Sequence, residues 1–95
     1  AAYAPPGAPS VEIARAPMPA PHLARLTREL AEVAGVQDGD IFELLASSGP
    51  AMRFWAAGIV DEPGHRLWAH PEAALGDAPL RLRPLFHRIP RGTPA

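Results

Sequence analysis

Hydrophobic residues recur with the period of an amphipathic helix in the stretch that precedes Gly35. They lie three, four and three positions apart, at Leu23, Leu26, Leu30 and Val33. Charged side chains fill much of the surface between them, and Gly35 stands where many helices end. The pattern predicts a helix that starts near Pro21 and buries one apolar face.

A second apolar group follows two aspartates, Asp38 and Asp40, either of which can cap the start of a helix. The group reads Ile41-Phe42-Glu43-Leu44-Leu45 and is closed by Ser47-Ser48-Gly49-Pro50. We therefore expect a second, shorter helix packed against the first as a helical corner. The core of this corner is expected to consist of Leu26, Leu30, Val33, Ile41 and Leu44, covered by Phe54 or Trp55.

The pattern beyond Pro50 is typical of strands. Residues 52–60 are rich in aromatic and β-branched side chains, residues 61–64 (Asp-Glu-Pro-Gly) form a strong turn signal, and residues 65–70 can return as a second strand. This order predicts a β-hairpin. Residues 80–83 alternate as Leu-Arg-Leu-Arg, and the following proline indicates an edge strand.

Prolines divide the chain into segments, because six of the thirteen fall in residues 1–21 and none falls in residues 22–49. Proline prevents helix formation in the first segment, so we expect an extended arm, in which Val11-Glu12-Ile13 can add one short strand to a sheet of this chain or of a partner. The predicted domains are an arm (1–21), a compact helix-helix-hairpin domain (22–77) and a basic, irregular tail (78–95). The predicted fold class is α+β.

Composition limits the size of the domain and its location. The chain has 95 residues, a net charge of −1 and no cysteine, and all nine basic residues are arginine, which we interpret as a high-GC coding bias. About 70 residues can share a core, too few for a large internal cavity. Without cysteines or a long apolar run, the expected location is cytoplasmic and no membrane contact is expected.

The segment from Leu30 to Leu45 resembles the helix-turn-helix of many bacterial regulators. Ala31 is small, Gly35 lies four positions later in the turn, and Ile41 and Leu44 occupy positions where a second helix packs back. With a hairpin behind it, the segment is similar to a winged-helix domain, which implies a nucleic-acid-binding regulator. The surface that would face DNA instead carries Asp38, Asp40 and Glu43, and acidic groups are repelled by phosphates, so nucleic acid is an unexpected partner.

A second resemblance begins at Glu43, where a helix end is followed by strands containing Phe54-Trp55 and Leu67-Trp68, and then by a Pro-Leu-Arg-Leu-Arg segment. This order looks like the small docking domains that join subunits of modular synthases, which implies a protein partner. Exposed aromatic and arginine side chains often anchor such interfaces. The candidate partner-binding residues are Val11, Ile13, Trp55, Trp68, Arg81, Arg83, Phe86 and Arg88.

Catalytic and metal-binding patterns are absent from the sequence. There is no G-x-S-x-G, no phosphate-binding glycine loop and no closely spaced histidine pair, and His65 and His70 would fall on opposite faces of a strand. We therefore assign no catalytic residue, no metal ligand and no cofactor. The expected function is that of a non-catalytic accessory subunit which binds a protein partner or a second copy of itself. The alternatives are a winged-helix-like regulator and a small subunit that completes an enzyme complex.

Overall fold

The computed structural model describes residues 8–85 of the chain. Within them lie six strands and one helix, whose bounds are β1 Ser10–Arg15, β2 Leu23–Thr27, α1 Arg28–Ala34, β3 Ile41–Leu45, β4 Met52–Val60, β5 Arg66–Ala69 and β6 Leu80–Pro84. No helix in this part of the chain has the length and apolar character needed to cross a membrane.

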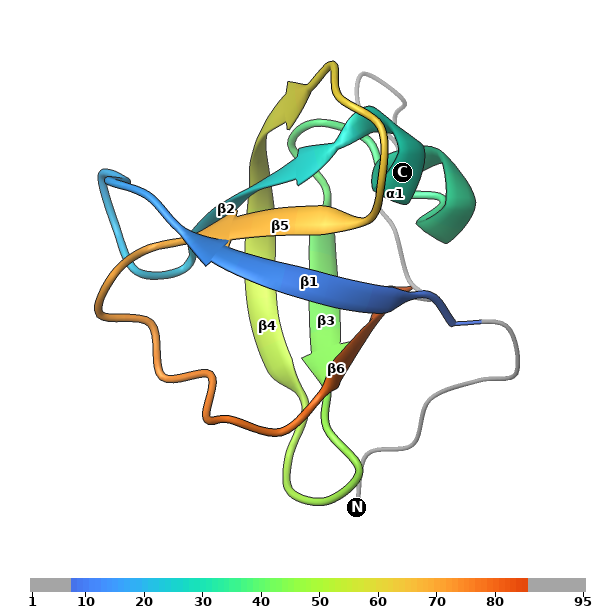
Figure 1. Cartoon of the computed structure of the whole chain (residues 1–95). Coiled ribbons are helices and arrows are strands. Elements are labelled where there is room, and N and C mark those ends of the chain that lie inside the picture. Colours follow the sequence, from blue (N-terminus) through green and yellow to red (C-terminus); the bar gives the residue numbers. More distant parts are fainter. Residues whose placement is uncertain (1–7, 86–95) are drawn as a thin grey trace, which may run out of the picture.

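The six strands form a closed barrel in the order β1-β5-β2-β4-β3-β6 (Figure 1). Two pairs are parallel, β1 with β5 and β2 with β4, and the other four pairs are antiparallel. The predicted α+β fold of two helices and a hairpin is therefore wrong. The domain is a mostly-β mixed barrel with a single short helix among the described residues.

The first predicted helix begins at Arg28, about seven residues later than expected. Leu23 to Thr27 are extended as β2, and Thr27 caps α1 with its side-chain oxygen, which accepts a hydrogen bond from the Leu30 amide. The helix ends as predicted, because Gly35 adopts the left-handed conformation with φ of 74°. The misleading signal was Leu23, since a residue three positions before Leu26 extends a helical stripe even when it belongs to a strand.

The second predicted helix is the strand β3, so the helix-turn-helix resemblance is wrong as well. Phe42 and Leu44 point into the barrel, while Glu43 and Leu45 point outward and are nevertheless buried. A strand covered on both faces reads as a continuous apolar run, and periodicity alone does not separate such a run from a buried helix. Its five residues are a normal length for a strand.

The strand predicted at residues 52–60 is confirmed as β4, but the hairpin is wrong. β4 pairs with β2 and β3, whereas β5 pairs with β1 and β2. β2 thus lies between the two strands that the turn at residues 61–64 connects. The sequence contains the turn signal, but the partner of each strand is decided by barrel closure.

The predicted arm and tail both contribute strands to the barrel. β1 forms within the expected arm at Val11-Glu12-Ile13 and pairs with β5 and β6, and Met18 in the same segment is buried. β6 pairs with both β1 and β3, so it is not an edge strand. For the described residues of both segments, the extended-arm and irregular-tail parts of the predicted fold class are corrected accordingly.

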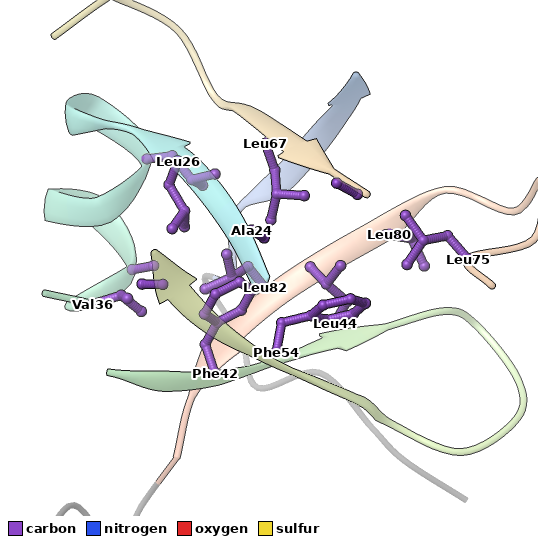
Figure 2. Close-up of a cluster of buried hydrophobic side chains, with 14 of the residues drawn as sticks. Ala24, Leu26, Val36, Phe42, Leu44, Phe54, Leu67, Leu75, Leu80 and Leu82 are labelled. Atoms are coloured by element: carbon purple, nitrogen blue, oxygen red, sulfur yellow. The ribbon is translucent and has the colours of Figure 1, made fainter. Parts of the chain in front are cut away.

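The core lies inside the barrel and includes buried side chains from α1 and from every strand except β1, whose Val11 and Ile13 are partly buried and pack against it (Figure 2). Phe42 and Phe54 stack at its centre with ring centroids 6.1 Å apart. Leu26, Leu30, Leu44 and Phe54 are buried as expected. Two predicted members are not: Val33 is 56% exposed on α1, and Ile41 lies on the outside of β3, opposite Trp55 in the register.

The strand pairing has an internal two-fold symmetry that relates β1-β2-α1-β3 to β4-β5-β6. Adding 43 to Glu12 gives Trp55 and subtracting 43 from Arg66 gives Leu23, so the pair Glu12–Arg66 maps onto the pair Trp55–Leu23. The antiparallel pair Ala24–Ala69 maps in the same way onto Leu67–Leu26. The chain therefore uses one strand arrangement twice, although its two halves differ in sequence.

The two halves close the two ends of the barrel differently. At the offset of 43, Thr27 corresponds to His70. Val11 pairs with Leu80 and its equivalent Phe54 pairs with Phe42, so Phe42 corresponds to Leu80 at an offset of 38. The connection in the second half is therefore five residues shorter and holds a turn where the first half holds α1. Leu30, Ala34 and Val36 seal one end, and Ala73 and Leu75 seal the other.

Candidate functional site

A group of large side chains lies on the outside of four neighbouring strands. We call Leu23, Arg25, Ile41, Trp55 and Trp68 the aromatic wall. Leu23 and Ile41 lie opposite Trp55 on either side of β4, and Arg25 lies opposite Trp68 on the next strand pair. The wall therefore runs across β5, β2, β4 and β3 in the order of the barrel.

Trp55 is the most exposed aromatic residue of the wall. Its exposed fraction is 49%, and the only other large hydrophobic residue so exposed in residues 8–85 is Val33. His22 packs edge-on against the indole ring with centroids 6.2 Å apart, and its backbone carbonyl accepts a hydrogen bond of 2.9 Å from the Trp55 amide. The ring is thus oriented by neighbours while much of its surface faces solvent.

Trp68 is half-buried and carries a cation on its face. The Arg66 guanidinium lies 5.9 Å from the ring centroid and is 3.2 Å from a carboxylate oxygen of Glu12 on β1. The charge of Arg66 therefore already has two partners within the domain, the Trp68 ring and the Glu12 carboxylate, and Arg66 is not a free cation for a ligand.

Arg25 stands between the two tryptophans, above an irregularity in the sheet. The register between β2 and β4 shifts after Ala24, so both Ala57 and Gly58 lie opposite Arg25. Gly58 has φ of 137°, and a Cβ at this position would be 3.4 Å from Cγ of Arg25. The absence of a side chain at residue 58 lets the Arg25 stem lie flat over β4, on the side of Trp55.

The Arg25 guanidinium is exposed, and within residues 8–85 it makes no hydrogen bond or ion pair. Three other arginines of the strands are matched to acids, with Arg66 on Glu12 and both Arg53 and Arg83 on Glu43. Arg25 is therefore a cation of the wall that is positioned but not neutralised.

Charge is segregated between the strands and their connections. The strands carry Arg15, Arg25, Arg53, Arg66, Arg81 and Arg83 against Glu12 and Glu43, a net charge of +4. The other described residues carry Arg28 against Glu29, Glu32, Asp38, Asp40, Asp61, Glu62, Glu72 and Asp77, a net charge of −7. The six strands together are thus basic, although the whole chain is slightly acidic.

The predicted partner-binding residues are distributed over the barrel. Trp55 and Trp68 are on the wall; Arg81 and Arg83 are on β6, which lies across the barrel from β2. Val11 and Ile13 are partly buried and pack against the core. Phe86 and Arg88 lie outside the described residues. The structure therefore brings together the two tryptophans and separates them from the arginines predicted to act with them.

The sequence pattern places Leu23 and Ile41 on apolar helix faces, so it misses them as surface residues. It places Arg25 on the exposed face of the predicted helix, which is correct as to exposure but does not show that Arg25 lies beside the tryptophans. The alternation Leu23-Ala24-Arg25-Leu26 is compatible with a strand, but only the pairing with β4 and β5 shows that Leu23 and Arg25 share the outer face with the tryptophans.

The histidines take structural positions in the described part of the chain. His65 Nε2 is 3.3 Å from Glu29 on α1, and His70 Nδ1 accepts a hydrogen bond of 2.9 Å from the Glu72 amide. Among residues 8–85 there is no group of three or more histidine, aspartate or glutamate side chains arranged to hold a metal ion.

A groove lies between α1 and the end of β4. Its volume is about 470 Å³, and it is lined by Arg28, Ala31, Glu32, Val36, Gln37, Asp38 and Ile59. Arg28 is tied to Asp61 at 3.2 Å. The rim is polar and acidic, and no nucleophile, such as a serine or threonine hydroxyl, lines the groove. We regard the aromatic wall as the better candidate site because it combines an exposed aromatic ring with an unneutralised cation.

Comparisons of the chain with models of protein families, with curated proteins and with solved structures find no match.

Proposed function

We propose that this domain is a non-catalytic interaction module that binds a protein partner through the aromatic wall. The observation that carries the proposal is Trp55, which is 49% exposed and is flanked by Leu23 and Ile41 on the neighbouring strands. Tryptophan is strongly enriched among residues that dominate binding energy in interfaces. A cytoplasmic location stays a prediction from the composition.

Apolar surface of Trp55 that is in contact with solvent contributes favourable free energy to binding when a partner covers it. A tryptophan buries about 150–250 Å² when fully covered, and each square ångström of apolar surface removed from water contributes about 25 cal/mol. Trp55 is oriented by His22 instead of being folded into the core, which itself is filled by Phe42 and Phe54. A partner that covers Trp55 therefore gains apolar burial without having to reorganise the barrel.

The test is selection of 12-residue peptides from a random displayed library on the immobilised domain. The wild-type domain should enrich a family of related sequences, and Trp55→Ala should abolish the enrichment. Val33→Ala removes the other exposed large apolar residue, on α1, and should leave the enrichment intact. Circular dichroism and urea unfolding of each variant check that the barrel is folded.

Equal enrichment by the wild type and Trp55→Ala would refute the proposal, and so would the absence of any enriched family. The sequence also leaves open that the chain binds a second copy of itself, and light scattering on the wild-type domain tests this alternative. A dimer that dissociates in Trp55→Ala would identify the wall as a self-association surface in place of a partner site.

A further inference from the structure

We infer that Arg25 makes the aromatic wall selective for an acidic segment of protein, in which a carboxylate lies two or three residues from an apolar side chain. The inference rests on the proposed function and names the chemistry of its partner. The carboxylate is received by Arg25, and the apolar side chain packs on Trp55 between Leu23 and Ile41.

The position of Arg25 is fixed by the sheet beneath it. The bulge at Ala57 and Gly58 leaves an open strip of backbone, and the atoms Cγ, Cδ and Nε of Arg25 lie 3.4, 3.6 and 3.7 Å from where a residue-58 Cβ would be. Trp68, directly opposite on β5, borders the stem on the other side. An arginine ordered in this way loses little conformational freedom when it forms a two-point contact with a carboxylate.

The geometry also sets a spacing. Arg25 lies over Gly58, and Trp55 is three residues earlier on β4, a separation of about 10 Å at about 3.3 Å per residue. An extended peptide that runs along β4 covers this distance in about two to three residues. A spacing of two keeps both side chains of a regular extended peptide on the wall, and a spacing of three does so where the peptide has a bulge, as β4 has at Ala57 and Gly58. The recognised sequence should therefore hold the acidic and the apolar side chain at a fixed short spacing.

The charge distribution favours an acidic protein segment over a nucleic acid. Arg53, Arg66 and Arg83 on the strands are already matched to Glu43 and Glu12. A long polyanion would meet few unmatched cations on the wall and would also approach the connections, which carry a net charge of −7. Nucleic-acid affinity rises with the number of phosphates neutralised, so one free arginine supports a carboxylate contact better than a phosphate track.

The experiment begins with the peptides selected on the wild-type domain. Their sequences should be enriched in aspartate or glutamate two or three positions from an aromatic or aliphatic residue. The most enriched peptide is synthesised with its acid intact and with that acid replaced by its amide, and both are titrated against the domain by tryptophan fluorescence. Loss of the charge should weaken binding about tenfold.

Variants of the domain assign this loss to Arg25. Arg25→Gln should lower the affinity for the acidic peptide about tenfold and leave the affinity for the amide peptide unchanged. The reason is that the domain variant and the amide replacement each remove the same contact. Arg25→Glu should restore binding when lysine replaces the acidic residue of the peptide. Arg81→Gln is the matched control: Arg81 is an exposed strand arginine on β6, across the barrel, and its variant should bind like the wild type.

Five outcomes would overturn the inference. Selected peptides without acidic enrichment, or equal weakening of both peptides by Arg25→Gln, would leave a purely apolar site and the proposed function intact. A fluorescent 12-nucleotide single-stranded DNA is titrated by anisotropy. If it binds the domain more tightly than the selected peptide does, and if this binding is lost in Trp55→Ala, the wall is a nucleic-acid site. An Arg25-dependent dimer in light scattering would make a second copy the occupant. Failure of the wild-type domain to select any peptide would remove the proposed function itself.

Discussion

The two ends of the barrel are closed by segments that occupy equivalent places in the strand pairing but differ in size and chemistry. At one end α1 supplies Leu30, Ala34 and Val36, and at the other a short turn supplies Ala73 and Leu75. Figure 1 shows α1 beyond one end of the barrel and the turn between β5 and β6 on the other side. The same pairing of six strands thus tolerates a helix in one half and a turn in the other.

The polar contacts that hold these segments differ in the same way. Thr27 is fully buried, and its hydroxyl donates to the Gly64 carbonyl and accepts from the amides of Leu30 and Arg66. Its equivalent, His70, is only partly buried and is held by Arg15, which donates hydrogen bonds to the carbonyls of His70 and Ala73. The helical end depends on a buried hydroxyl, and the turn end depends on an arginine from β1.

Removing the apolar seal should produce the largest effect, and it should be greater at the helical end. Leu30→Ala is expected to cost about 3–5 kcal/mol, because Leu30 is fully buried under α1 and a rigid helix leaves a cavity. Leu75→Ala should cost about 2–3 kcal/mol, since a short turn can collapse into the space. Urea unfolding of both variants measures the difference, and equal losses would show that the two ends are equivalent in rigidity.

Removing the buried hydroxyl is the next test. Thr27→Val keeps the side-chain volume but removes a donor to Gly64 and an acceptor for two amides, and should cost about 1–3 kcal/mol. Thr27→Ser keeps the hydroxyl and should recover much of this loss. A Thr27→Val variant as stable as the wild type would mean that these hydrogen bonds contribute nothing net.

The turn end should respond to Arg15. Arg15→Gln removes the two-carbonyl contact and is expected to cost about 1 kcal/mol. Hydrogen exchange should become faster for the amides of His70 and residues 72–76 while α1 keeps its protection. Arg25→Gln, a similar change on β2 that removes no hydrogen bond or ion pair within residues 8–85, should leave exchange at both ends unaltered.

The smallest effect is expected for the surface ion pair beside α1. Arg28 lies 3.2 Å from Asp61, with side chains that are 54% and 85% exposed, so solvent screens the interaction. Arg28→Ala should change the free energy of unfolding by about 0.5 kcal/mol or less. A larger loss in urea unfolding would show that the link from α1 to the end of β4 supports the helical closure.

Local signals in the sequence identified several elements correctly. Gly35 ends the helix, residues 52–60 form a strand, and Leu26, Leu30, Leu44 and Phe54 are buried. Each of these depends on a few neighbouring residues. The signal at Thr27, an N-cap residue followed by Glu29 in the first turn, was present but was outweighed by the longer apolar stripe.

The barrel itself was not predictable in this way, because its pairs join residues far apart in the chain. Glu12 pairs with Arg66, and β2 inserts between β4 and β5 although a turn connects those two strands. The composition of the aromatic wall was difficult to predict for the same reason. Trp55 and Trp68 were identified as candidate anchors, but Leu23, Arg25 and Ile41 join them only through the register.

The meeting of β1 and β6 has a consequence for the order of folding. These strands are the first and last of the barrel, and their register contains only two pairs, Ser10 with Arg81 and Val11 with Leu80. Contacts between such distant residues form only after a large loss of chain entropy, which slows the folding of barrels relative to helical domains. During synthesis the first strand must therefore wait for nearly the whole domain to emerge before the barrel can close.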